Sequence, residues 1–381
     1  MKPKDILTNP NFCPMPWTGL MYNFDGEVKN CIRSAGPLGD IKTQSIESIL
    51  LDNNNPRQQN ILEHNPVDTC HTCYDLERGK KNINMISDRI FYIRELKHID
   101  TNTYRENNFD LKTIDVRWSN LCNFACVYCG PQFSSKWAQE LSSHFDVPTD
   151  EQRNKFKEYI LHNASKLKHV YLAGGEPLLM KENLELLEIL KKENTDITIR
   201  INTNLSKVDT AIFDRICEFE NVHWTISVES QGDEFEYIRY GGKWSDFLEN
   251  LDIISKRPHK VSFNMLHFLL NYMSLFDCVD FLVGRGFHHN SFIIGALLTP
   301  DYLNIRQLPS DVLKSVEREL ITRINKSPGF LLEESYRNLL AYIQQPFESD
   351  IETSFKRLAE LDLRRHIDSS KIFKDLYKIK T

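Results

Sequence analysis

Seven of the nine cysteines fall into two groups whose spacing suits metal binding. The groups are Cys13, Cys31, Cys70 and Cys73, and then Cys122, Cys126 and Cys129. Four thiolates can close a tetrahedral zinc site or saturate a four-iron cluster. Three thiolates leave one iron of such a cluster open to a ligand, unless a remote side chain completes a structural metal site. The two groups therefore predict different chemistry.

The second group resembles the signature of the radical S-adenosylmethionine (SAM) superfamily. Its spacing is C-x3-C-x2-C, and the aromatic Tyr128 precedes the third cysteine. The resemblance implies that these three cysteines hold a [4Fe-4S] cluster whose open iron binds SAM. It covers about residues 112–300.

A second segment, Gly174, Gly175, Glu176 and Pro177, resembles the Gly-Gly-Glu-Pro segment that holds the SAM amino group in this superfamily. The chemistry is reasonable, because glycines allow close backbone approach and carbonyl and carboxylate oxygens accept hydrogen bonds from an ammonium. Later polar residues match the family more weakly, and each is also compatible with an ordinary surface position. By resemblance they would contact the SAM ribose or carboxylate: Asn202, Asn204, Ser227, Glu229 and Arg239. Glu229 stands where many relatives have Asp.

The first cysteine group resembles the auxiliary-cluster modules called twitch or SPASM. The matching features are Phe12–Trp17 around Cys13, Asp25-Gly26 before Cys31, and the Cys70-x2-Cys73 pair. Such modules usually follow the barrel, whereas this one precedes it. The resemblance implies a second, auxiliary [4Fe-4S] cluster, although cysteine spacing alone leaves zinc open.

By resemblance, the chain is expected to be an enzyme that cleaves SAM reductively to a 5′-deoxyadenosyl radical, which abstracts hydrogen from a substrate. The first expectation for the substrate is a peptide or protein, with a small molecule such as a sugar or nucleotide as the alternative. A reductant such as flavodoxin or ferredoxin is an implied partner. Two other interpretations are a zinc-stabilised binding protein without enzymatic activity and a family member that binds a cluster without turnover.

The segments that must position these residues are predicted to alternate between strands and helices. Strands are predicted at 113–118, 168–173, 196–202, 221–228, 259–267 and 290–296. Helix-length segments lie between them, one starting with a capping box at Thr149 and Gln152. Alternation of this kind indicates parallel βα units, and six units favour an α/β fold with a partial (β/α)6 TIM-like barrel.

Three parts of the chain are predicted. Residues 1–105 form a loop-rich auxiliary-cluster module, residues 106–300 the barrel, and residues 301–381 a helical extension. Within the first part, residues 1–75 are rich in Pro, Gly and Asn and are expected to form loops and short strands, including a hairpin with its turn at Asp25-Gly26.

Composition is that of an ordinary globular protein. The 381 residues are 41% hydrophobic and 26% charged, and the net charge of −6 gives no reason to expect a nucleic-acid partner. We find no secretory signal and no membrane-length apolar run, so we expect a cytoplasmic protein with no membrane association. In a reducing compartment the cysteines predict metal sites rather than disulfides, and the isolated Cys217 and Cys278 are interpreted as small hydrophobic residues.

Overall fold

The computed structural model describes residues 9–78, 87–95 and 104–379. The chain divides into two compact units. The first contains Met1–Leu121, Ser142–Asn202 and Asp209–His223, and the second contains Cys122–Leu141, Thr203–Val208 and Trp224–Thr381. The division passes through two strands, and each unit is described below by itself.

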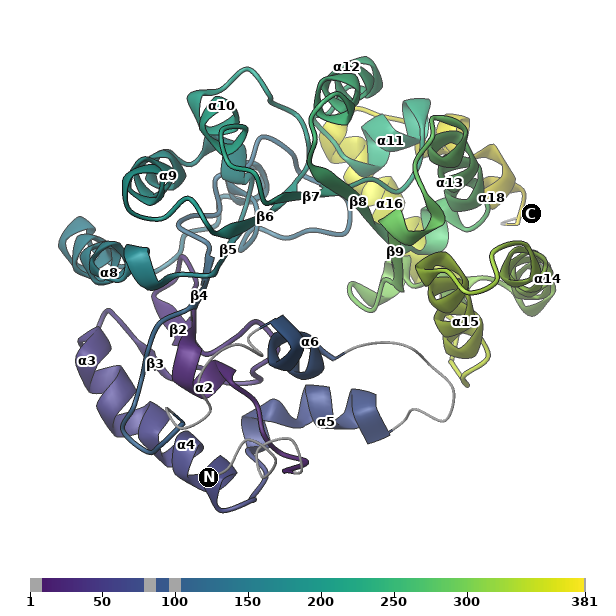
Figure 1. Cartoon of the computed structure of the whole chain (residues 1–381). Helices are drawn as coiled ribbons and strands as arrows, with labels where there is room; N and C mark the ends of the chain where they lie inside the picture. The colour runs from purple at the N-terminus through teal and green to yellow at the C-terminus, as the bar shows by residue number, and fades with distance from the viewer. Residues whose placement is uncertain (1–8, 79–86, 96–103, 380–381) are drawn as a thin grey trace. The chain divides into compact units, whose positions relative to one another are not determined.

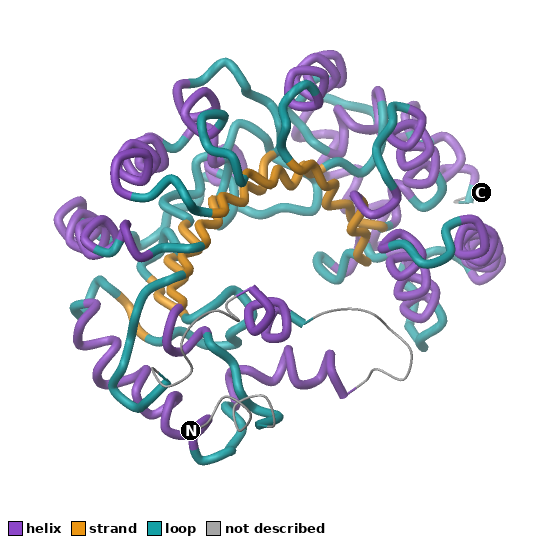
Figure 2. The backbone as a smooth tube through the Cα atoms, viewed as in Figure 1, coloured by secondary structure: helices purple, strands orange, loops and turns teal. Residues whose placement is uncertain are grey.

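Strands and helices alternate through most of the chain (Figures 1 and 2). The strands are β1 Gly19–Tyr22, β2 Glu27–Lys29, β3 Gly39–Asp40, β4 Thr113–Val116, β5 His169–Leu172, β6 Thr198–Thr203, β7 Val222–Ser227, β8 Lys260–His267 and β9 Phe292–Ala296. Their order in the sheet is β3-β2-β1-β4-β5-β6-β7-β8-β9. The pairs β4–β5, β5–β6 and β8–β9 are parallel, which confirms the predicted α/β class.

The six predicted strands correspond to β4–β9, and three more strands of the N-terminal segment join the sheet. The predicted hairpin is present as the antiparallel pair β1–β2. Strand β1 then pairs in parallel with β4, and all four residues of Gly19–Tyr22 are buried. This pairing covers the edge of β4, whose backbone groups would otherwise be exposed.

The helices lie mostly between the strands. They are α2 Met15–Thr18, α3 Ile46–Ser48, α4 Asn55–Leu62, α5 His71–Arg78, α6 Asp88–Glu95, α7 Ser135–Glu140, α8 Asp150–His162, α9 Lys181–Glu193, α10 Ala211–Ile216, α11 Gly232–Ile238, α12 Trp244–Ser255, α13 Ser274–Gly284, α14 Ser310–Lys326, α15 Leu331–Ile343, α16 Ile351–Arg365, α17 Ser369–Ile372 and α18 Lys374–Lys378. The predicted capping box is formed at the start of α8, where Thr149 and Gln152 bond each other's backbone N–H. In the first unit, α8 and α9 lie on one face of β4–β6 and α6 lies on the other (Figure 1).

The N-terminal segment is more helical than predicted. Residues 1–75 were expected to be loops and short strands, but α2–α4 and the start of α5 lie there. Helix α4 gave no periodic apolar signal because it turns polar residues inward. Gln58 is fully buried and donates to the carbonyl oxygens of Pro16 and Asn108, at 3.0 and 2.8 Å. Tertiary hydrogen bonds therefore stabilise this helix in place of an apolar stripe.

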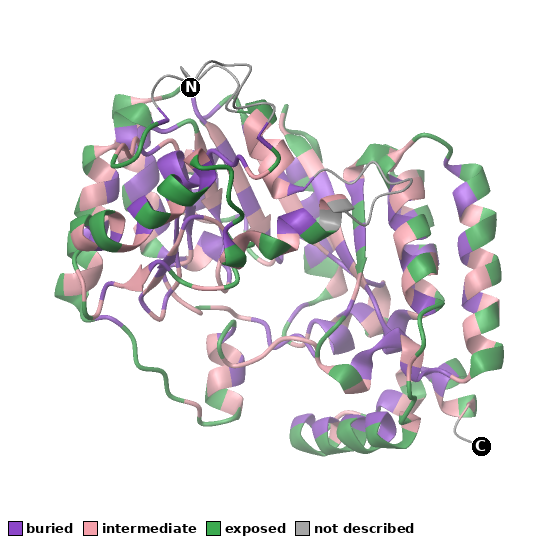
Figure 3. Ribbon diagram, turned by 90° about the horizontal axis from the view of Figure 1, so that it is seen from below, coloured by how far each residue is buried: buried purple, intermediate pink, exposed green. Residues whose placement is uncertain are grey.

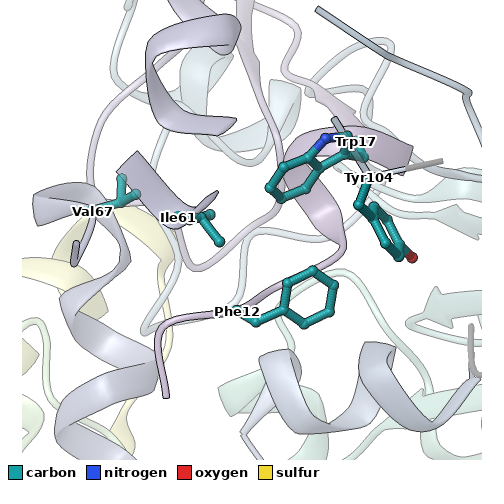
Figure 4. Close-up of a cluster of buried hydrophobic side chains, with 5 residues drawn as sticks. All are labelled: Phe12, Trp17, Ile61, Val67 and Tyr104. Carbon is teal, nitrogen blue, oxygen red and sulfur yellow. The ribbon is translucent and has the colours of Figure 1, made fainter. Parts of the chain in front are cut away.

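A small hydrophobic cluster forms the core of the N-terminal segment (Figure 4). Its members are Phe12, Trp17, Ile61, Val67 and Tyr104. The three aromatic rings lie 5.1 to 6.0 Å apart between centroids, and two of the three contacts are edge-to-face. Cys70 packs against this cluster, so the core holds a cysteine of the first group in place.

The C-terminal part is helical, as predicted, with α14–α18. Helix α14 buries Val316, Leu320 and Ile324 along one stripe and exposes charged residues elsewhere. Figure 3 shows the same division between buried and exposed residues on its helices. Among the described residues, no helix combines the length and the apolar character that a membrane span requires.

Candidate functional site

The second cysteine group occupies a loop of the second unit that begins at Cys122. Two backbone hydrogen bonds hold it to the end of α11 and the residues that follow: Ala125 N–H donates to Tyr240 O and Val127 N–H donates to Ile238 O, both at 2.8 Å. The Trp137 indole N–H donates to Cys126 O at 2.7 Å. The loop backbone is therefore fixed at several points.

Each sulfur of this loop has a polar neighbour. The Asn204 amide lies 3.7 Å from Cys122 Sγ, and an Arg239 guanidinium nitrogen lies 4.0 Å from Cys126 Sγ. The Cys129 thiol lies 3.8 Å from the Gly130 carbonyl oxygen, to which it can donate. Burial raises the pKa of the Cys129 thiol to about 12, with the Cys126 charge as the next cause. A bound cation is what would favour the thiolate form here.

Tyr128, Glu229 and Arg239 form a polar triad next to Cys126, and Glu229 and Arg239 are buried. Arg239 donates to both carboxylate oxygens of Glu229 at 2.7 Å, and it also donates to the Tyr128 hydroxyl at 2.8 Å. Tyr128 donates in turn to Glu229 at 3.0 Å. Burial raises the pKa of Tyr128, so its hydroxyl stays protonated. Burial acts to lower the pKa of Arg239, but the charge of Glu229 reverses the effect and raises it. The guanidinium thus remains charged beside the thiol.

Sequence reasoning missed several residues that contact this loop, and Arg365 is the most distant in sequence of those described here. Arg365, at the end of α16, donates to Ala125 O at 2.9 Å and forms an ion pair with Glu140 at 3.1 Å. Its guanidinium lies over the rings of Trp137 and Tyr240, at 4.4 and 4.3 Å. The side chain is buried, and its charge lowers the pKa of Cys126 against the larger effect of burial. No local motif marks Arg365, because 236 residues separate it from Cys129.

The Gly174–Pro177 segment packs closely on the backbone after β4, within the first unit. A Cβ on Gly175 would meet Leu121 O at 2.2 Å, and Gly174 has a φ of +111°. Glu176 is fully buried, and its N–H donates to Leu121 O at 2.7 Å. Glycine is therefore required at both positions by close approach and by backbone conformation.

Two further side chains fix this segment. The Trp118 indole donates to Asn183 Oδ1 at 3.0 Å, and the Asn183 amide donates to Pro177 O at 2.9 Å. Asn183, at the start of α9, is fully buried. Neither Trp118 nor Asn183 was singled out from the sequence, since each reads as an ordinary core or helix residue.

The remaining predicted positions lie at strand ends. Asn202 has a buried Oδ1 with no hydrogen-bond partner among the described residues. Asn204 contacts Cys122 and also donates to Asn123 at 3.2 Å. Ser227 is half-buried at the end of β7. The structure thus joins Asn204, Glu229 and Arg239 to the cysteine loop. The SAM contacts that the family resemblance assigns to these residues remain predictions.

The four thiols of the first group influence one another. Burial raises the pKa of Cys13 well above its ordinary value, and the charges of Cys31, Cys70 and Cys73 raise it further. The segments that carry them are tied together, since the Ala35 N–H donates to Thr69 O at 2.8 Å. These thiols are free of disulfides.

Several groups around the first cysteine group counteract the effect of burial on the thiol pKa values. Backbone N–H groups face three of the sulfurs: that of Met15 faces Cys13, those of Arg33 and Ser34 face Cys31, and that of Arg89 faces Cys73. The arginine side chains Arg33, Arg57 and Arg89 lie near the thiols and lower the pKa of Cys73 or Cys70 against the larger effect of burial. Donors to sulfur and nearby cations stabilise an anionic iron–thiolate centre.

The donor sets fit clusters. Within residues 9–78, 87–95 and 104–379, no three His, Cys, Asp or Glu side chains converge closely enough to hold one metal ion. A zinc ion needs four sulfurs, each about 2.3 Å from one point. In a four-iron cluster each cysteine binds a different iron, so its ligands stand farther apart. Thiols with nearby N–H donors and arginine charges suit an anionic iron–thiolate group.

Two family models match the chain. The model of the radical SAM superfamily matches residues 116–282, and the model of an iron–sulfur cluster-binding domain, SPASM, matches residues 13–74. The first match includes all three cysteines of the second group and the Gly174–Pro177 segment. The second match includes all four cysteines of the first group.

Similarity to two of the curated proteins is local. The chain is 35% identical over 83 residues to 7-carboxy-7-deazaguanine synthase of Clostridium acetobutylicum, covering 22% of this chain and 33% of that protein. It is 27% identical over 85 residues to GTP 3',8-cyclase of Campylobacter lari, covering 22% of this chain and 24% of that protein. The chain therefore matches a third or less of the length of these relatives.

Solved structures also resemble part of the chain. Native anSMEcpe with bound AdoMet has a TM-score of 0.44 and 17% identity, covering 56% of this chain and 60% of that chain. Streptococcus suis SuiB bound to the precursor peptide SuiA has a TM-score of 0.42 and 12% identity, covering 77% of this chain and 66% of that chain.

Proposed function

We propose that the chain is a radical SAM enzyme that cleaves SAM reductively and abstracts hydrogen from a substrate, because residues 116–282 match the radical SAM model and residues 13–74 match an iron–sulfur cluster-binding domain. In this proposal Cys122, Cys126 and Cys129 hold the [4Fe-4S] cluster that binds SAM. When bound, that cluster supplies the electron that breaks the SAM sulfonium, which yields the 5′-deoxyadenosyl radical. The observation that carries the proposal is the three-thiol loop, whose sulfurs each have a polar neighbour.

The protein's own residues hold and orient this centre. Arg239 keeps a positive charge 4.0 Å from Cys126 Sγ, while Glu229 fixes the guanidinium in place. The resemblance assigns SAM contacts to Gly174–Pro177, Asn202, Asn204, Ser227, Glu229 and Arg239. Because Glu229 already accepts from two of the arginine nitrogens, we propose that it positions Arg239 rather than contacting SAM directly.

The first cysteine group is proposed to hold an auxiliary [4Fe-4S] cluster. Four cysteines leave no open iron, so electron transfer or structural support is the role that fits. The proposed division is an auxiliary module at 1–105, a barrel at 106–300 and a helical extension at 301–381. The two family matches support it, because each lies within one of the first two parts. A cytoplasmic location and a flavodoxin- or ferredoxin-like reductant belong to the same proposal.

A peptide or protein is the proposed substrate class, supported by the presence of the SPASM domain. The second candidate is a small molecule, which is favoured by the two local relatives named for a deazaguanine synthase and a GTP cyclase. Incubation with deuterated candidates separates them, because deuterium reaches 5′-deoxyadenosine only from a true hydrogen donor.

The activity itself is tested on anaerobically purified full-length protein. We expect brown protein with about eight iron atoms per chain, and 5′-deoxyadenosine upon addition of dithionite and SAM. Colourless protein containing zinc would overturn the proposal. Iron-loaded protein that forms no 5′-deoxyadenosine with any substrate would indicate a member without turnover.

A further inference from the structure

Charged side chains occupy the middle of strands β4–β6, where apolar residues are usual. Asp115, Tyr171 and Arg200 are neighbours in the sheet register, with Asp115 opposite Tyr171 and Tyr171 opposite Arg200. Side chains alternate along a strand, and the intervening Ile114, Val170 and Ile199 are buried in the core. The polar row therefore lies on the other face, which is the face that α6 covers within the first unit.

Arg200 is the member of this row without a counter-charge. Its Nε is buried and has no hydrogen-bond partner among the described residues, and no carboxylate there lies within salt-bridge distance of its guanidinium. The guanidinium lies 4.4 Å from the centre of the Phe91 ring on α6. Buried polar groups are normally satisfied, so an unpaired arginine N–H requires an explanation such as a bound ligand.

The other charges of the row are already compensated. Asp115 is buried and pairs with Arg117 through two contacts of 3.1 Å. Burial lowers the pKa of His169, which keeps it neutral, and the exposed Glu95 lies 3.9 Å from it. Burial raises the pKa of Tyr171 to about 12, so its hydroxyl remains a donor. Among the described residues of this row, Arg200 alone has no carboxylate partner.

We propose that Arg200 binds a carboxylate of the substrate on this face, with the hydroxyls of Tyr171 and Tyr92 as additional donors. Tyr92 follows Phe91 on α6, and the centroids of their rings lie 5.1 Å apart. The inference rests on the proposed function and names its substrate chemistry: an acidic peptide side chain or a free carboxylate end. A planar guanidinium matches a carboxylate with two parallel hydrogen bonds.

The charge balance favours a carboxylate over a phosphate. A carboxylate brings one negative charge, which matches the one cation of the described row that has no carboxylate partner. A phosphate group brings up to about two negative charges and usually requires more than one cation.

The test uses full-length, cluster-loaded protein and blocked pentapeptides, acetyl-Gly-Gly-X-Gly-Gly-amide, in which X is Glu, Gln or phosphoserine. Dissociation constants are measured anaerobically in the presence of SAM. We expect the Glu peptide to bind at least about tenfold more tightly than the Gln peptide, because the pair differs only in the charge and its hydrogen bonds. A Gln peptide with a free carboxyl end distinguishes a chain terminus from a side chain as the source of the carboxylate.

Arg200→Gln should reduce the Glu-to-Gln preference to about onefold, and Arg200→Lys, which keeps the charge but not the planar fork, should retain about threefold. The matched control is Arg318→Gln on the exposed face of α14, which should keep the full preference. Thermal unfolding of each variant checks folding, and Arg200→Lys remains informative if Arg200→Gln does not fold.

Three outcomes overturn the inference: equal or absent binding of the Glu and Gln peptides to the unmodified protein, tighter binding of the phosphoserine peptide, or an unchanged preference in both Arg200 variants. Formation of 5′-deoxyadenosine without peptide is measured on the same preparation of unmodified protein. If none forms, the proposed function fails regardless of the peptide result, so the two failures remain distinguishable.

Discussion

The thiols of the first group come from separate segments between Cys13 and Cys73, whereas those of the second group come from one loop between Cys122 and Cys129. The first set is assembled by a hydrophobic cluster and by hydrogen bonds between segments, such as Ala35 N–H to Thr69 O. The second set is close in sequence, and long-range contacts serve to fix its loop. The comparison teaches that the same ligand type can depend on remote packing or on local spacing.

Removing a thiol of the second group should have the largest effect. In Cys126→Ala we expect SAM cleavage to fall at least about 100-fold and the iron content to fall by about four atoms per chain. The first group should keep its iron, because its ligands lie elsewhere. Iron and sulfide analysis with a 5′-deoxyadenosine assay checks this, and Cys217→Ala is the control. Loss of all iron in Cys126→Ala would show that the two groups are not independent.

Breaking the buried pair behind Cys126 should have the next largest effect. Glu229→Gln leaves the Arg239 charge buried with a neutral partner, at an expected cost of about 3–5 kcal/mol in the free energy of unfolding. Replacing both residues in Glu229→Gln/Arg239→Met should cost less than the single change. Urea unfolding of the metal-free protein measures both. A double variant that is less stable than Glu229→Gln would contradict the assignment of Glu229 as the partner of a buried charge.

The dependence of the first group on packing can be tested without touching a ligand. Ile61 is fully buried in the cluster that Cys70 packs against. Ile61→Ala should destabilise the protein by about 3 kcal/mol and weaken iron retention at the first group, because the cavity loosens the segments that carry the thiols. SAM cleavage without substrate should change less than twofold. Chelator challenge followed by iron analysis checks the result, and normal iron retention would argue that the thiol segments are held by other contacts.

The smallest expected effect concerns Arg365. Arg365→Met keeps most of the side-chain volume but removes the hydrogen bond to Ala125 O and the ion pair with Glu140. We expect a loss of about 1–3 kcal/mol in stability and a shift of the loop-held cluster to a more negative reduction potential, since a nearby positive charge is removed. Spectroscopic redox titration measures the shift. An unchanged potential with lowered stability would limit Arg365 to a structural role.

Much of the fold was predictable from the sequence because its signals are local. The six strands β4–β9 alternate apolar and polar residues or form short apolar runs, and the capping box at Thr149 marks a helix start. Helix α4 was not predictable, since its buried Gln58 is polar and finds its partners around Pro16 and Asn108. A prediction based on hydrophobic periodicity does not detect a helix that long-range hydrogen bonds stabilise.

The candidate site divides in the same way. The cysteines and the Gly174–Pro177 segment were identified because their chemistry requires fixed residue types at fixed spacing. Arg365 and the row of Asp115, Tyr171 and Arg200 were not, because each acts through neighbours that come from other strands or helices. Charged residues within predicted strands were the available signal for this row. The sequence did not show which face of the sheet their side chains occupy, because that depends on the strand register.

The sequence by itself therefore determined the two donor sets and the alternation of strands and helices, since thiol spacing and side-chain periodicity are properties of short segments. The tertiary structure alone decided that β1 joins the sheet beside β4, that Glu229 accepts from two of the three side-chain nitrogens of Arg239, and that Arg200 Nε has no hydrogen-bond partner among the described residues. These facts depend on which distant groups come into contact when the chain folds. Those contacts set the free energy of burying a charge.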